Sequence, residues 1–130
     1  MERIEVTPEM GRQPEVSAFI EQFYESREVP MKVIMSMNIV LDEIFSNVVY
    51  YSGAASVRIS CDVVNHSAVL VVEDDGSPYD PTQTEEPDTA LTAEEREIGG
   101  LGIHLVRKMM DGIVYRREDG WNRLRMEKKF

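Results

Sequence analysis

The chain has 130 residues, and its 24 Asp and Glu against 14 Lys and Arg give a formal net charge of −10. This length suits one domain over residues 1–130, and a single cysteine excludes an internal disulfide framework. The acidic balance makes the chain a poor ligand for nucleic-acid phosphates. The sequence starts without an apolar leader, and no stretch approaches the ~18 apolar residues of a membrane span. We therefore expect a cytoplasmic protein that binds neither nucleic acid nor a membrane.

The first half of the chain predicts a strand and two helices. Apolar and polar residues alternate over 3–7, and apolar residues recur at helical spacing over 16–23. Pro30 suits the first turn of a second helix, whose apolar stripe continues as far as a stop at Gly53. Three methionines of that helix are expected to fill gaps in the core: Met31, Met35 and Met37.

A hairpin is expected next, with strands over 57–63 and 68–72 joined by a turn at Asn65-His66-Ser67. Cys61 alternates with polar neighbours, so we expect it to pack as a thiol on one strand face. Neither Cys61 nor His66 has metal-ligating neighbours in the sequence, so no zinc site is expected.

Residues 76–99 lose this periodicity and carry three prolines, seven acidic residues and one base, Arg96. Such a segment inside a small domain is either disordered or a functional lid, and we place the lid at about 77–99. A helix is expected from the glycine cluster at 99–102 to Asp111, before a last hairpin. The order of elements predicts the α+β class, as a two-layer fold with a mostly antiparallel sheet and helices on one of its faces.

Three segments carry residues suited to chemistry. Glu43 and Asn47 are four residues apart on the second helix, so they project from the same face. Asp74 and Gly76 follow the second strand of the hairpin, and the glycine cluster at 99–102 opens a helix. Each segment alone is weak evidence, because polar pairs on helices are mostly solvated and glycines mostly mark tight turns.

Together the three segments suit a nucleotide. Glycines allow close approach of the backbone to a ligand, and a helix N-terminus favours phosphate oxygens. The Asn47 amide oxygen suits Mg²⁺, and Glu43 can take a proton from an attacking hydroxyl or water. Asp74 can accept a hydrogen bond from an exocyclic amine such as that of adenine. A Walker-type phosphate loop is excluded, because the sequence contains no Gly-x-x-x-x-Gly-Lys-Ser/Thr.

These segments resemble the ATP-binding boxes of the GHKL ATPases, the superfamily of gyrase, molecular chaperones, histidine kinases and MutL. Within it, the chain is similar to the small bacterial anti-sigma-factor serine/threonine kinases of the RsbW and SpoIIAB type, and the resemblance covers nearly the whole chain. The matching boxes are Glu43-x-x-x-Asn47, Asp74-Asp75-Gly76-Ser77-Pro78-Tyr79-Asp80-Pro81 and Ile98-Gly99-Gly100-Leu101-Gly102-Ile103-His104-Leu105-Val106-Arg107.

The resemblance implies a Bergerat-type α/β sandwich that binds Mg-ATP and phosphorylates a serine or threonine of a STAS-domain anti-anti-sigma partner. Many members also sequester a sigma factor, and the family often forms homodimers. By position, Glu43 would be the general base, Asn47 the Mg²⁺ ligand and Asp74 the adenine contact. The other ATP contacts implied are Gly76 beneath the base, Gly100, Leu101 and Gly102 along the phosphates, and Arg96 as a phosphate contact suggested by its charge.

Two positions depart from the family pattern. Tyr51 stands where many members carry His or Lys, and Gly120-Trp121-Asn122-Arg123 lacks the threonine common near the adenine pocket. Trp121 is expected to pack on the hairpin. A second hypothesis therefore stays open, that of a nucleotide-binding module that sequesters a partner with little or no catalysis. The uneven charge, +4 over 107–130 and −14 over 1–106, is either a solvated surface or a means of steering a protein partner.

Overall fold

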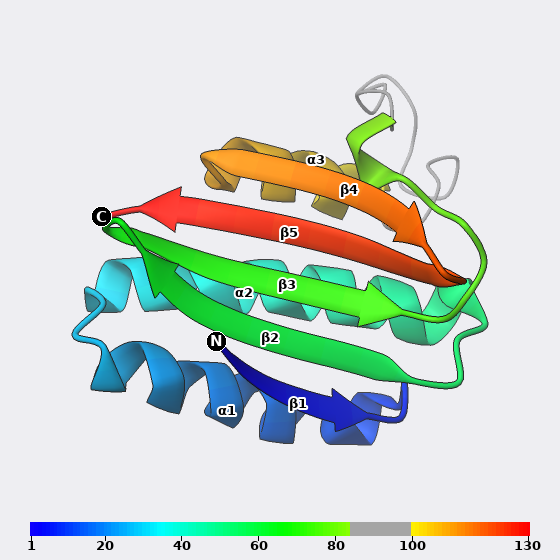
Figure 1. Ribbon diagram of the computed structural model, residues 1–130, viewed down its shortest axis with the longest axis horizontal. Coiled ribbons are helices and arrows are strands. Elements are labelled where there is room, and N and C mark those ends of the chain that lie inside the picture. Colours follow the sequence, from blue (N-terminus) through cyan, green and yellow to red (C-terminus); the bar gives the residue numbers. More distant parts are fainter. Residues whose placement is uncertain (84–99) are drawn as a thin grey trace.

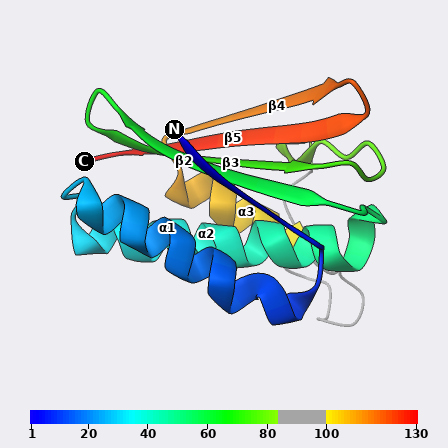
Figure 2. The same cartoon turned by 60° about the horizontal axis from the view of Figure 1, so that its bottom comes forward.

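The computed structural model describes residues 1–83 and 100–130, which form a five-stranded sheet covered on one face by three α-helices (Figures 1 and 2). The strand order is β1-β2-β3-β5-β4, and every neighbouring pair is antiparallel. The expected two-layer α+β fold is therefore confirmed. The strands are β1 (Glu2–Val6), β2 (Val57–Val64), β3 (Ser67–Asp74), β4 (Gly112–Glu118) and β5 (Trp121–Lys129), and the helices are α1 (Gln13–Ser26), α2 (Met31–Asn47) and α3 (Gly100–Met109).

The core lies between the inner face of the sheet and the helices. Side chains alternate along a strand, so Ala68, Leu70 and Val72 of β3 pack in the core while Glu73 lies on the outer face. Cys61 is fully buried, as expected, and burial raises the pKa of its thiol to about 12. The central helix, α2, lies between α1 and α3 (Figure 2). Its buried side chains are Val33, Ile34, Met37, Val40, Leu41, Ile44 and Phe45.

Two of the three methionines expected in the core lie at the surface. Met37 is fully buried, whereas Met31 and Met35 are each 60% exposed. The prediction for these two residues is wrong, because apolar residues occupy both sides of α2. Their spacing alone does not say which side meets the sheet.

The end of α2 continues into a π-helical turn, Val48–Ser52, and stops at Gly53 as expected. Gly53 has a φ of 68°, the left-handed conformation typical of a helix C-terminus. The combined helix Met31–Ser52 has a mean hydropathy of 1.3 and is long and apolar enough to cross a membrane, contrary to the expectation that no stretch is long enough to do so. A core helix passes the same test, and this one buries one of its sides beneath the sheet.

Both hairpins turn through two residues in the left-handed region. The φ angles are 49° and 60° at Asn65 and His66, and 52° and 81° at Asp119 and Gly120. Two successive residues of this kind match the twist of antiparallel strands. The hairpin turn expected at 65–67 is therefore confirmed, with Ser67 as the first residue of β3.

The expected lid extends beyond the part of the chain that the structure describes. Residues 77–83 follow β3 and include a short 3₁₀ turn, Pro81–Gln83. The remainder, 84–99, lies outside the described residues, and so does Arg96. α3 begins at Gly100, within the expected glycine cluster.

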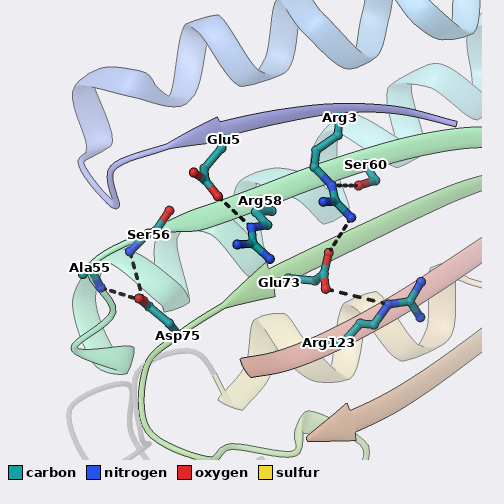
Figure 3. A network of polar contacts seen from close by, with 9 residues as sticks. All are labelled: Arg3, Glu5, Ala55, Ser56, Arg58, Ser60, Glu73, Asp75 and Arg123. Carbon is teal, nitrogen blue, oxygen red and sulfur yellow. Dashed lines mark hydrogen bonds and ion pairs between the residues drawn. The ribbon is translucent and has the colours of Figure 1, made fainter. Parts of the chain in front are cut away.

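The outer face of the sheet carries paired charges (Figure 3). Arg58 lies 2.6 Å from Glu5, and Arg3 lies 3.5 Å from Glu73. The guanidinium of Arg58 also stacks over the ring of Trp121, 3.8 Å from its centroid. Trp121 therefore packs on the outer face of the sheet, as expected of a hairpin residue.

Candidate functional site

A cavity of about 500 Å³ lies between the sheet and the end of α2. Its volume suits a small-molecule ligand, since such pockets measure ~300–1,000 Å³. Its walls come from segments far apart in the chain, and they are mostly apolar with a few polar groups. The lining residues are Ile44, Asn47, Val48, Tyr51, Ser52, Val72, Asp74, Ser77, Pro78, Tyr79, Pro81, Ile103, Tyr115, Asn122 and Leu124.

Asp74 ends β3 inside this cavity and is only 7% exposed. Its Oδ1 accepts hydrogen bonds from the backbone N–H of Gly76 at 2.9 Å and from the side-chain amide of Asn122 at 3.1 Å. Burial raises the pKa of Asp74, and these two hydrogen bonds oppose the rise by stabilising the charged form. Within the described ranges, no hydrogen bond reaches Oδ2. A carboxylate held in this way can accept a hydrogen bond from a ligand amine.

Asn122 is the residue of this site that the sequence analysis missed as a functional group. It lies on β5 directly opposite Asp74 and is 5% exposed. Besides the bond to Asp74, its amide donates to the carbonyl of Ser77 at 2.8 Å. Its Oδ1 accepts from the backbone N–H of Tyr79 at 3.2 Å and from the hydroxyl of Tyr115 at 2.6 Å. One side chain therefore holds Asp74, the chain that follows β3, and an aromatic wall of the cavity.

Close packing requires a glycine at position 76, two residues after Asp74. A Cβ at Gly76 would lie 2.4 Å from the carbonyl oxygen of Ser52, far closer than real Cβ contacts. Its φ lies outside the left-handed region, so turn geometry does not require glycine here. The neighbouring Asp75 instead accepts hydrogen bonds from the backbone N–H groups of Ser56 and Ala55, which lower its pKa and tie the end of β3 to the segment before β2 (Figure 3).

Glu43 and Asn47 lie one turn apart on α2, as expected, and the Asn47 side chain lies close enough to Glu43 to affect its pKa. Asn47 lines the cavity. Burial raises the pKa of Glu43, and the Asn47 side chain partly opposes this rise. Gly102, in the first turn of α3, packs so closely on this pair that a Cβ there would lie 1.9 Å from the Glu43 carboxylate carbon. The missing side chain at position 102 therefore allows α3 to approach α2.

The structure brings most of the predicted site residues to one region. Asn47 and Asp74 line the same cavity, which α3 reaches through Ile103. Gly100 and Leu101 lie in the first turn of α3, where free backbone N–H groups favour anions. Glu43 is not among the lining residues of this cavity, and instead lines a neighbouring hollow.

The polar groups of the cavity fit a magnesium–nucleotide complex. Among residues 1–83 and 100–130, no cluster of three or more His, Cys, Asp or Glu could hold a metal ion. Asn47 supplies one hard amide oxygen. That is sufficient for Mg²⁺ bound with a nucleotide, since this ion keeps several waters and takes its other ligands from phosphates.

The cavity therefore combines a buried aspartate at a strand end, an asparagine on the facing helix and a helix that begins at a glycine, an arrangement suited to a nucleotide. The chain matches the histidine kinase-like ATPase domain over residues 5–128, and it belongs to that family. The resemblance inferred from the three sequence boxes is therefore confirmed, and ATP is the nucleotide that the family implies.

The relatives agree with this assignment. The chain is 30% identical over 93 residues to serine/threonine-protein kinase BtrW of Bordetella bronchiseptica, an alignment that covers 68% of this chain and 66%, just under two thirds, of that protein. The structure of the SiaB–SiaC complex from Pseudomonas aeruginosa matches with a TM-score of 0.62 and 11% identity, over 100% of this chain and 90% of that one. The Acinetobacter baumannii histidine kinase AdeS matches with a TM-score of 0.52 and 16% identity, over 99% and 68%. These two structural matches support the fold alone.

Proposed function

We propose that the protein is an ATP-dependent serine/threonine protein kinase of a bacterial partner-switching system, with a STAS-type anti-anti-sigma protein as its phosphate acceptor. The observation that carries this proposal is the Glu43–Asn47 pair, which lies against Gly102 and next to a cavity with a buried aspartate. Similarity to a protein named as a serine/threonine kinase supports it. Acting in the cytoplasm and sequestering a sigma factor belong to the same proposal.

In this proposal, the adenine amine donates a hydrogen bond to Asp74, which Asn122 holds in place. Gly76 permits close approach at this end, and the backbone of Gly100, Leu101 and Gly102 lies along the phosphates. Asn47 would hold Mg²⁺, which when bound neutralises phosphate charge.

Glu43 acts as the general base in the transfer step. Its carboxylate accepts the proton of the acceptor Ser or Thr hydroxyl, and the hydroxyl oxygen forms a bond to the γ-phosphorus. The bond from that phosphorus to the β–γ bridging oxygen breaks, and ADP leaves. Partial burial raises the pKa of Glu43, which makes it a stronger base than an exposed glutamate.

Phosphate transfer from labelled Mg-ATP to purified STAS-domain proteins tests this proposal. We expect wild type to label one serine or threonine and Glu43→Ala to label none, although the variant still binds ATP. Glu25→Gln, a change at an exposed glutamate of α1, is the matched control and should retain full transfer. Absence of transfer by the wild type to a partner that it binds would refute the kinase proposal.

A second candidate is a nucleotide-binding module that sequesters its partner with little catalysis. It is favoured by Tyr51, which lines the cavity where many family members carry a basic residue. The same assay separates the candidates, because a sequestering module would bind ATP and the STAS protein without transferring phosphate. Size-exclusion chromatography with light scattering would show whether the chain forms the homodimer common in the family.

A further inference from the structure

The solvent side of α2 carries an apolar stripe where a surface helix is ordinarily polar. Met31, Met35 and Ile39 follow each other at intervals of four residues, so they share one face of the helix. They are 60%, 60% and 46% exposed. The buried side of the same helix is already filled by other apolar residues, so packing under the sheet does not account for the stripe.

The stripe leads directly to the proposed catalytic base. A second hollow, of about 490 Å³, lies beside it and is lined by residues of α1, α2 and α3 and of the turn before α1. Its apolar lining includes Met10, Ile39 and Leu105, and its carboxylates are Asp42 and Glu43. Met10 and Leu105 are 38% and 48% exposed, so apolar side chains from the turn before α1 and from α3 reach solvent at the same hollow as Ile39.

Glu43 lines this hollow, whereas Asn47 and Asp74 line the larger cavity. The nucleotide of the proposed reaction occupies the larger cavity. The acceptor hydroxyl, however, must come within hydrogen-bond distance of Glu43. The hollow is therefore the route by which a macromolecular hydroxyl can reach the base without displacing ATP.

We propose that the apolar surface formed by Met10, Met35, Ile39 and Leu105, here called the acceptor face, is the docking site of the protein that receives the phosphate. This inference rests on the proposed kinase function. The occupant is a folded protein that presents its serine or threonine from an apolar surface, since such a surface complements the acceptor face. Methionines suit this role because their flexible side chains adapt to a partner surface.

The outer face of the sheet differs in that several of its charged side chains are paired with each other, as Arg58 is with Glu5. An exposed valine on that surface, Val114 of β4, is 52% exposed and provides a matched control position for the acceptor face.

Steady-state transfer kinetics on Met35→Glu and Ile39→Glu test the inference, with a STAS-domain protein that the wild type phosphorylates. We expect each variant to raise the KM for the acceptor about tenfold or more. In Met35→Glu the turnover number at saturating acceptor and the Mg-ATP affinity should stay near wild type, because this exposed side chain lies about two helical turns from Glu43. Val114→Glu should change none of these values, and Met35→Ser provides a milder change of the same face.

Three outcomes would overturn the inference. If wild type transfers phosphate but both variants match Val114→Glu, the inference fails alone and the kinase proposal stands. If wild type is a dimer that Ile39→Glu dissociates while transfer is unaffected, the face is covered by a second copy of the chain. If wild type binds a STAS-domain protein but transfers no phosphate to it, the proposed function fails and this inference fails with it.

Discussion

The two ends of the proposed site are held in different ways. At the base-recognition end, Asp74 and Asn122 lie opposite each other in the sheet, are at most 7% exposed and share a closed set of hydrogen bonds. At the transfer end, Glu43 and Asn47 lie where α2 meets α3, only partly buried and next to an exposed apolar surface. Hydrogen bonds within the chain hold the base-recognition end in place, whereas the transfer end lies next to an exposed surface.

The proposed function accounts for this difference between the two ends. A nucleotide base is small and rigid, so a preorganised pocket lowers the cost of binding it. A protein acceptor, by contrast, must bring its hydroxyl to Glu43, the proposed general base, through an opening wide enough for a folded protein surface. Substitutions at one end at a time should therefore separate effects on ATP affinity from effects on the transfer rate.

Asp74→Asn is expected to have the largest effect. It removes the charged acceptor at the base-recognition end and should weaken Mg-ATP binding by about 100-fold, corresponding to the upper range for a buried hydrogen bond to a charged group. Calorimetric titration measures the change. Asp75→Asn is the matched control, since Asp75 bonds to the backbone of Ala55 and Ser56 outside the cavity, and it should retain ATP affinity. Equal losses in the two variants would contradict the assignment of Asp74.

Gly102→Ala perturbs the transfer end. The added Cβ would overlap the Glu43 carboxylate, so this side chain must move. Displacement of a catalytic group by about 1 Å lowers the reaction rate by up to about 100-fold. We expect the transfer rate to fall much more than the ATP affinity. Gly11→Ala adds a methyl group where nothing lies within 4 Å and should leave both unchanged. Equal loss of affinity and rate would indicate that position 102 serves binding alone.

Asn122→Ala loosens the base-recognition end. It removes one of the two hydrogen bonds to Asp74 and leaves the Tyr115 hydroxyl without its asparagine partner, so we expect about 1–3 kcal/mol lower free energy of unfolding and roughly tenfold weaker ATP binding. Denaturant unfolding and calorimetry measure the two effects. Asn38→Ala removes a hydrogen-bonded asparagine of α2 outside the cavity and should affect stability only. An unchanged ATP affinity in Asn122→Ala would show that Asn122 does not position Asp74.

We expect the smallest effect in the pH dependence of the phosphate-transfer rate. In the proposed mechanism, transfer requires the ionised Glu43 carboxylate, and burial raises the pKa of this group above the ordinary value of 4.5. The rate should therefore decrease on acidification, with its midpoint above pH 4.5, and level off at higher pH. The pH profile of kcat/KM for Mg-ATP, which reports groups of the free protein, tests this, and a midpoint at or below 4.5 would show that Glu43 is not the titrating base.

Local pattern was sufficient to predict most of the fold. Asn65 and Gly53, which have positive φ angles, lie at the hairpin turn after β2 and at the end of the helix that continues α2, as the sequence predicted. Both positions were predictable because turn and cap geometry depend on neighbouring residues. Met31 and Met35 were misplaced because α2 is apolar on two sides, and only the packed sheet selects between them. The π-helical turn after Asn47 carried no signal of its own.

Some residues of the candidate site could also be predicted from short sequence motifs, and others could not. Glu43, Asn47 and Asp74 were recognisable because they stand in short motifs, and the family match supports the motif reading. Asn122 was not, because its importance depends on the register that places β5 against β3, a pairing of residues 48 positions apart. The one indication in the sequence was that the segment 120–123 lacks the threonine common in the family near the adenine pocket.

Calorimetric titration of Mg-ATP into wild type and Asn47→Ala tests the central claim most directly. The account predicts one nucleotide bound per chain in wild type, loss of most of that affinity when magnesium is chelated, and a comparable loss in Asn47→Ala with or without magnesium. No binding of Mg-ATP by wild type, or equally tight magnesium-dependent binding by Asn47→Ala, would contradict it.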